Sequence, residues 1–189
     1  MNIFYTNTNP ILCAADHNTV HCRKMIIEYA QLLSTAHRML DGTEIVGKSK
    51  TGRKQVTYKH SDINMHVILY KATHVNHPST VWVRTSIYHY WWLFGVYSEL
   101  CNIYTRATGK IHKTSHLLPY LKSPPHNIPA IGWQDPFVAI NLTQYPEVKP
   151  LIDTSNTLGA YRLYIQLKLK DWVERGIKFS WYTQQPDWF

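Results

Sequence analysis

Hydrophobic and polar positions follow a helical period along the first part of the chain. In "HCRKMIIEYAQLLSTAHR", residues 21–38, apolar side chains recur three and four residues apart and cover about half of the helix they would form. Residues 16–19 supply candidate N-cap residues, and Asp41-Gly42 supplies a left-handed C-cap. The pattern predicts a helix from Val20 to Leu40.

A second long apolar pattern begins at "NHPS", where Pro78 suits the first turn of a helix and Asn76 or His77 suits its cap. It runs to Thr108, and Gly109 ends it. A shorter helix is expected over residues 114–121 and a last long one over residues 156–175. Between them, residues 124–155 show no helical period and are expected to be irregular.

Strand-like patterns occur in two places. "NIFYT", residues 2–6, reads as a short β segment or an ordered extended arm, and "NTNP" after it reads as a turn. Residues 44–60 hold two β-like runs around "KSKTGRK", which predicts a hairpin insertion with a basic tip that includes Lys48. The chain is expected to be mainly α: a compact single-domain helical fold over residues 1–189 with a short N-terminal extended arm and this hairpin.

Composition narrows the functional classes. The chain has 189 residues, 44% of them apolar, with a net charge of +8 and seven Trp and thirteen Tyr. A basic surface with exposed rings is typical of nucleic-acid binders, although a basic enzyme with no nucleic-acid partner has the same charge. No long apolar run predicts a membrane span or signal peptide, so we expect a cytoplasmic protein, in the host cytoplasm if it is phage-encoded. Three cysteines without a CxxC pair are expected to stay reduced.

Two polar stripes are the candidate site. On the first helix, one stripe about 100° wide holds His21, Lys24, Glu28, Gln31, Thr35 and Arg38. On the second helix, one side holds Arg84, Tyr88, Trp91, Gly95, Ser98, Glu99, Asn102 and Arg106. Facing each other, they would line a cleft for a phosphate-bearing ligand with a stacked base, and Gly95 would mark a groove or a close neighbour. Either stripe is also compatible with an ordinary solvated face.

Other chemistries receive little support from the motifs. Cys13, His17 and His21 stand four residues apart, but a fourth metal ligand is not evident, so no metal site is expected. "KIHK", residues 110–113, reads as a basic loop for phosphate contact. Spacing alone leaves a Ser-His-Asp or Cys-His triad open, but no GxSxG nucleophile elbow is present. The absence of a phosphate-binding loop and of a dinucleotide fingerprint disfavours NTP hydrolysis and nicotinamide chemistry, and no cofactor is expected.

The stretch "ADHNTVHCRKMIIEYAQLL", followed by "HVNHPSTVWVRTSIYHYWWLFGVYSELCNIYTRATGK", resembles the phage-type pyrimidine-dimer DNA glycosylase/AP lyase (endonuclease V) family. It resembles more closely uncharacterised phage and bacterial proteins with an NHP-x-x-x-W pattern, over roughly the first 115 residues. The resemblance implies that Glu28 is the catalytic carboxylate and that an N-terminal α-amine attacks deoxyribose C1′ to form an imine. Asn2 departs from the small residue that the family exposes there, and Met1 is normally retained before a residue of this size.

The expected function is that of a DNA base-excision or base-modifying enzyme, an N-glycosylase with or without AP lyase activity, whose catalytic residues are Glu28 and Met1 or Asn2. The partner is DNA or a nucleotide, and the oligomeric state is left open. Two alternatives stand beside it: a non-enzymatic phage nucleic-acid or host-factor binding protein, and an enzyme acting on free nucleotides. Nucleic-acid contacts are expected from His21, Lys24, Gln31, Arg38, Lys50, Arg53, Lys54, His77, Arg84, Tyr88, Trp91, Lys110 and Lys113.

Overall fold

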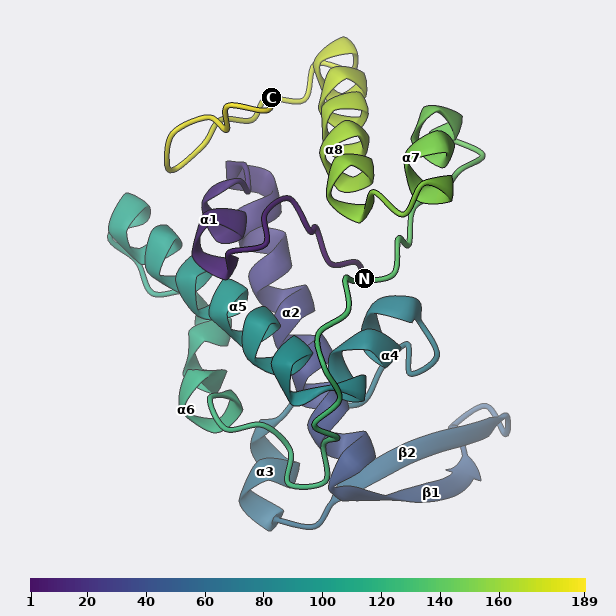
Figure 1. The fold of residues 1–189 in the computed structure, drawn as a ribbon. Coiled ribbons are helices and arrows are strands. Elements are labelled where there is room, and N and C mark those ends of the chain that lie inside the picture. Colours follow the sequence, from purple (N-terminus) through teal and green to yellow (C-terminus); the bar gives the residue numbers. More distant parts are fainter.

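The computed structural model describes residues 1–189 and is mainly helical, as the sequence predicts (Figure 1). The only strands form one antiparallel hairpin. In chain order the elements are α1 (Pro10–Ala15), α2 (Thr19–Leu40), β1 (Gly42–Lys48), β2 (Lys54–His60), α3 (Ile63–Ile68), α4 (Pro78–Thr85), α5 (Ile87–Thr108), the 3-10 helix η1 (Lys113–Leu117), α6 (Leu118–Leu121), the 3-10 helix η2 (Pro146–Val148), α7 (Lys149–Asp153) and α8 (Thr157–Glu174).

Helix α2 is the central element and begins as predicted. The Asn18 side chain accepts hydrogen bonds from the backbone N–H groups of the next turn, which satisfies donors that the helix itself cannot. The predicted left-handed C-cap is wrong, because Asp41 ends the helix with φ −109° and Gly42 begins β1. Gly42 is needed for a different reason: a Cβ there would overlap the Arg38 carbonyl oxygen, so only glycine lets the strand leave the helix at this angle.

The predicted second helix is two helices. Ser86 is extended (φ −151°, ψ 141°) and separates α4 from α5. Its hydroxyl accepts from the Tyr88 N–H as the N-cap of α5 and donates to the Ile131 carbonyl, so tertiary contacts hold the break. The start at Pro78 with His77 as N-cap is confirmed, and Gly109, with φ 68°, ends α5.

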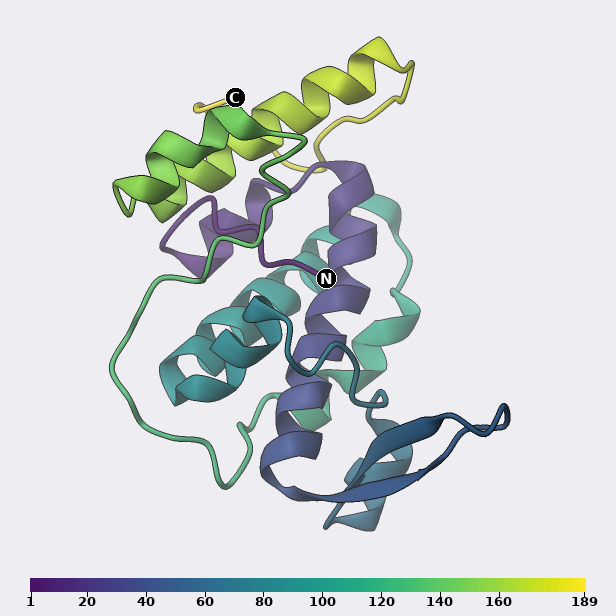
Figure 2. The same ribbon diagram turned by 90° about the vertical axis from the view of Figure 1, so that its right-hand side faces the viewer.

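The core lies where α2, α4 and α5 meet, and the N-terminal segment runs into it (Figures 1 and 2). Residues 3–6 are buried without pairing in a sheet, so the ordered-arm alternative is correct. All three cysteines are buried and free, as expected.

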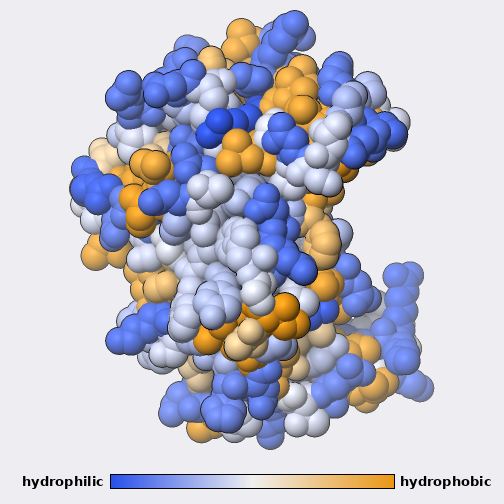
Figure 3. Space-filling model, viewed as in Figure 1, coloured by the Kyte–Doolittle hydropathy of each residue, from blue (hydrophilic) through white to orange (hydrophobic).

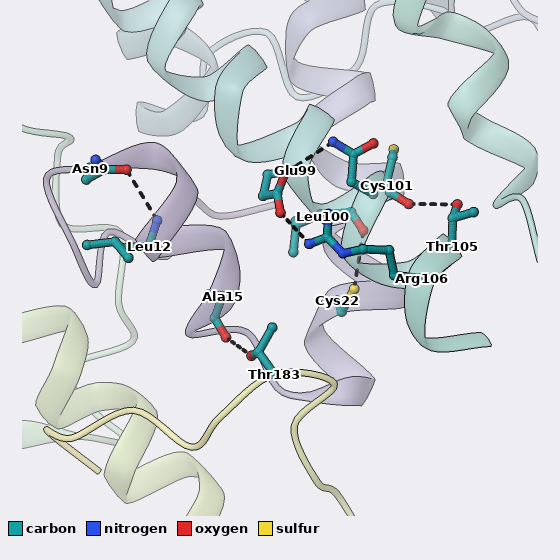
Figure 4. Close-up of polar contacts among 11 residues, drawn as sticks. Asn9, Leu12, Ala15, Cys22, Glu99, Leu100, Cys101, Thr105, Arg106 and Thr183 are labelled. Atoms are coloured by element: carbon teal, nitrogen blue, oxygen red, sulfur yellow. Dashed lines mark hydrogen bonds and ion pairs between the residues drawn. The ribbon is translucent and has the colours of Figure 1, made fainter. Parts of the chain in front are cut away.

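Helix α1 corrects the prediction of a simple turn at "NTNP". The Asn9 side chain caps it, as Figure 4 shows for the bond from the Leu12 N–H, and Pro10 occupies its first turn. A Cβ added at Gly95 would lie 3.2 Å from the Pro10 ring. Gly95 therefore marks a close neighbour, the first turn of α1, rather than a ligand groove.

The hairpin extends away from the helices at the lower end of α2 (Figure 1). Its register pairs Gly42 with His60 and Lys48 with Lys54, and most of its side chains are exposed. Helix α3 follows it and was not predicted. Residues 124–145 are irregular as expected, but η2 and α7 lie within the remainder of the segment predicted to be irregular.

The C-terminal part folds back over the N-terminal part. Helix α8 agrees with the predicted last helix to within one residue at each end, and the tail after it returns to form a bridge between Trp181 and Asn18. The Thr183 hydroxyl donates to the Ala15 carbonyl, as Figure 4 shows. No helix combines the length and apolar character that crossing a bilayer requires.

Candidate site at the start of the chain

Glu28 lies where the start of the chain meets α2. Its Oε2 accepts a hydrogen bond from the Asn2 backbone N–H at 3.3 Å, and its Oε1 pairs with Lys24 Nζ at 3.2 Å. The Glu28 side chain is 15% exposed and that of Lys24 56% exposed. The carboxylate is therefore accessible at one edge and held between a cation and the backbone nitrogen of Asn2.

The Asn2 side chain fixes the position of this nitrogen. Its Nδ2 donates to the Ala139 carbonyl at 2.9 Å, and its Oδ1 accepts from the Tyr161 hydroxyl at 3.0 Å. Three segments far apart in sequence thus hold one residue. An asparagine at this position has a structural reason, because a smaller side chain would lose both contacts.

A second set of bonds anchors the arm two residues further along, at Phe4. Tyr29 OH accepts from the Phe4 N–H and lies 3.0 Å from His17 Nε2, while His17 Nδ1 lies 2.8 Å from the Cys13 carbonyl. Because a carbonyl only accepts, Nδ1 carries the proton and Nε2 accepts from the tyrosine. His17 is thus a neutral link between arm and helix, not a metal ligand with Cys13 and His21.

This arrangement predicts acid sensitivity. Burial lowers the pKa of His17 to about 4, below its ordinary value of 6.5. The stability due to neutral His17 is thus present above pH 6.5 and is lost as the pH falls toward 4, with a slope of ~1.4 kcal/mol per pH unit. Urea unfolding between pH 7 and 4.5 should show a smaller pH dependence in His17→Gln than in the wild type. The exposed His116→Gln should keep the wild-type slope, and equal slopes in all three proteins would contradict the assignment.

Further groups from α4 and α8 surround Glu28. Burial lowers the pKa of His77, the N-cap of α4, and the charge of the Met1 amine adds to this lowering, while Glu28 opposes it. Burial, then the charge of Lys24, lowers the pKa of Lys168 on α8, and Glu28 again opposes this. Lys168 Nζ lies 5.4 to 5.8 Å from the ring centroids of Phe4, Tyr164 and Trp172 and donates to Tyr164 OH.

The structure brings only part of the predicted set together. Lys24, His77 and the first two residues share the surroundings of Glu28, and Gln31, partly exposed, follows one turn later on α2. Lys168 and Tyr164 were missed, because nothing in the period of the last helix indicates which of its side chains face α2. The position of Lys168 and Tyr164 beside Glu28 depends on tertiary packing, which the sequence pattern does not show.

Two predicted contacts are wrong. His21 is 2% exposed, with its ring between those of Phe4 and Trp172 at 4.8 and 4.9 Å. Arg38 is 4% exposed, and its guanidinium donates to backbone carbonyls of the hairpin and of the segment after it. Both belong to the polar stripe of α2, but the arm and α8 cover one end of that stripe and the hairpin base covers the other.

The predicted cleft between the stripes of α2 and α5 does not form. Helix α1 packs on α5 at Gly95, and the polar residues beyond this point pair among themselves. Glu99 accepts from Arg106 at 2.7 Å, as Figure 4 shows, and from Asn102 at 3.1 Å. Arg84 likewise donates to the Val75 carbonyl at 2.7 Å.

The remaining predicted contacts lie on other parts of the surface. Tyr88 and Trp91, both about half exposed, meet edge to face on the first turn of α5. Lys50, Arg53 and Lys54 lie at the hairpin tip, and Lys110 and Lys113 follow the C-terminal end of α5.

The surface offers room beside the start of the chain. In Figure 3 the right-hand outline is indented between the part formed by α7 and α8 and the hairpin below, and Figure 1 places the N-terminus beside this indentation. The start of the chain thus lies near a concave part of the molecular outline.

Comparison with known proteins does not assign a family to this fold and site. No family model, no curated protein and no solved structure matches the chain.

Proposed function

We propose that this chain is a DNA base-excision or base-modifying enzyme, an N-glycosylase that uses an N-terminal amine as nucleophile and Glu28 as its acid–base partner. The observation that supports this most directly is the 3.3 Å separation between the Asn2 nitrogen and Glu28 Oε2. A carboxylate at this distance can accept a proton from an amine and return it to a leaving group.

An α-amine suits this chemistry because its ordinary pKa of about 7.7 to 8.0 leaves a useful neutral fraction at pH 7, unlike a lysine at about 10.4. The amine lone pair forms the bond to C1′, the base departs with the electrons of the glycosidic bond, and a proton from the acid–base partner neutralises it. The nitrogen lone pair then displaces the ring oxygen from C1′, the second N–H proton passes to that oxygen, and the imine results. One amine and one carboxylate are sufficient for this sequence.

Which amine acts as the nucleophile depends on whether Met1 is removed from the chain. If Met1 is removed, the Asn2 nitrogen becomes the amine, already in contact with Glu28 and anchored through the Asn2 side chain. If Met1 is retained, its amine lies near enough to His77 and Glu28 to share their electrostatic environment. The first case gives the amine a direct contact with Glu28, and the second gives an amine that shares the charge environment of His77.

Contacts with DNA in this proposal come from Lys24 and Lys168, which bring positive charge beside Glu28. The net charge of +8 favours a polyanionic partner. A target nucleotide must leave the duplex to reach the carboxylate, and the exposed rings of Tyr88 and Trp91 offer a stacking surface elsewhere along the DNA. We place the activity in the cytoplasm, where the thiols of the free cysteines stay reduced.

Borohydride trapping tests the proposal. The full-length protein is incubated with oligonucleotides that carry abasic or modified-base sites, reduced with sodium borohydride, and read by intact mass and peptide mapping. A covalent adduct on the Met1 or Asn2 amine that Glu28→Gln abolishes is expected. An adduct on a lysine would contradict the assigned nucleophile. DNA binding without any adduct would indicate a monofunctional enzyme or a non-enzymatic binder.

A further inference from the structure

A cluster of three potential metal ligands lies at the opposite end of α2 from the arm. His37 and Asp41 stand one turn apart at the end of the helix, and His60 ends β2, where it pairs with Gly42. One ligand atom from each lies within 4.8 Å of the others. Because Glu28 and His37 are nine residues apart, this cluster lies about 13 Å along α2 from the candidate active site.

His37 presents an unused lone pair to the cluster. The Tyr90 hydroxyl donates to the Leu121 carbonyl at 2.8 Å, so it accepts from His37 Nε2, which lies 2.8 Å away. Nε2 therefore carries the proton of the neutral ring and Nδ1 does not. Nδ1 is buried without a hydrogen-bond partner in a residue that is 3% exposed. A histidine whose other nitrogen donates to an orienting oxygen has the arrangement of a metal ligand.

His60 supplies a second unpartnered nitrogen. The residue is 5% exposed, its Nδ1 accepts from the Asp62 N–H at 3.0 Å, and its Nε2 is buried without a partner. Two buried histidine nitrogens without partners next to one carboxylate are unusual, since buried polar atoms normally form hydrogen bonds.

Asp41 completes the set with an already oriented carboxylate. Its Oδ2 accepts from the His126 N–H at 2.7 Å, and its Oδ1 accepts from the Asn127 N–H at 3.0 Å and from Asn127 Nδ2 at 3.1 Å. These bonds fix the carboxylate and leave one lone pair free, on Oδ2, because Oδ1 already accepts two hydrogen bonds. Ligating carboxylates are held by outer partners in the same way.

We propose that His37 Nδ1, His60 Nε2 and an Asp41 oxygen bind a divalent metal ion of the zinc class, which joins the end of α2 to the base of the hairpin and to residues 126–127. Two imidazoles and one carboxylate are ligands that zinc accepts at about 2.0 to 2.2 Å. Tetrahedral ligands at such distances lie about 3.4 Å apart, so the ligand atoms must close in by up to about 1.4 Å from the 4.8 Å limit.

Metal binding requires the proton of the His60 ring to change position. His60 can bind a metal through Nε2 only when its proton moves to Nδ1, which breaks the bond from the Asp62 N–H. Asp62 is exposed, so water can accept that N–H instead. Binding thus changes the His60 tautomer and the contacts of the turn before α3, and it leaves the charge of each ring unchanged.

Zinc titration of the full-length protein after EDTA treatment tests this inference. We expect one equivalent of Zn²⁺ to bind by calorimetry and to raise the melting temperature. Asp41→Asn and His60→Gln should each weaken this binding by at least about 100-fold, because even outer-shell partners of a metal contribute 10- to 100-fold. His116→Gln, which removes an exposed histidine outside the cluster, should bind zinc as the wild type does.

Nitrogen NMR of the histidine rings gives a reading that does not depend on the folding of the variants. Zinc should shift His37 Nδ1 and His60 Nε2 and move the His60 proton to Nδ1. Absence of stoichiometric binding to the wild type, shifts confined to other histidines, or equal loss of binding in His116→Gln would overturn the proposal. Zinc binding at this cluster does not involve Glu28, so its outcome tests the metal site independently of the proposed glycosylase activity.

Discussion

Arg38→Met is expected to lower the free energy of unfolding by about 3–5 kcal/mol, the largest effect we expect from any single substitution outside the apolar core. All five N–H bonds of the guanidinium are used. Four go to the backbone carbonyls of Tyr58, His66, Leu69 and Tyr70, and one goes to His66 Nδ1. Urea unfolding at pH 7 measures the change.

The size of this effect follows from what the substitution leaves behind. A buried carbonyl without a donor costs about 1–3 kcal/mol, and Arg38 is the shared donor for one buried and three partly buried carbonyls. Methionine fills much of the volume but donates nothing. Arg38→Lys should rescue only part of the loss, because an ammonium has three donors at one point and cannot reproduce the planar geometry of five.

Arg23→Met is the matched control on the same helix. Arg23 is exposed and makes one hydrogen bond, to the Thr19 carbonyl one turn earlier, so its loss should change stability by less than about 0.5 kcal/mol. A similar small change in Arg38→Met would show that solvent or other donors satisfy the four carbonyls. In that case Arg38 would not be the link between α2 and the hairpin.

The fold class and the long helices could be predicted because they depend on local signals. The apolar period of residues 20–40, the Asn cap before it and the Pro78 start of α4 are all present within a few residues of sequence. The break at Ser86 could not be predicted in this way. The residues on both sides continue one helical period, and the Ile131 carbonyl that binds Ser86 lies in a distant irregular segment.

The candidate site was predictable only in part for the same reason. A polar stripe reports which residues share a helix face, and it does not report what covers that face. Glu28 is partly exposed, whereas His21 and Arg38, at two other positions of the same stripe, are buried by α8 and by the hairpin base. Polar residues that contact backbone carbonyls produce the same pattern as residues that contact a ligand.

Glu28→Gln is expected to lower the single-turnover rate of base release or strand cleavage by about 10²- to 10⁴-fold, the usual contribution of a positioned acid–base group. Glutamine keeps the shape of the side chain and can still accept a hydrogen bond from the Asn2 nitrogen, but it cannot exchange a proton. The rate is measured on the best substrate from a panel of abasic and modified-base oligonucleotides.

Stability should change little in this variant, because the ion pair between Lys24 and Glu28 is partly exposed and such i,i+4 pairs contribute about 0.3–0.5 kcal/mol. Glu99→Gln is the matched control. Glu99 also has a side chain that is 15% exposed and pairs with a cation, Arg106, but it lies on the far part of α5. It should retain the wild-type rate.

DNA affinity separates catalysis from simple binding at the same carboxylate. Removing a negative charge beside the phosphates should leave the affinity of Glu28→Gln unchanged or slightly higher, with a salt dependence close to that of the wild type. A loss of rate at unchanged affinity is the result an acid–base role requires, because the substitution then affects only the transition state. Equal rates in Glu28→Gln and the wild type would contradict that role. An inactive wild type that binds DNA as tightly as the variant would instead support a non-enzymatic binder, in which Glu28 serves only to hold Lys24 and the arm in place.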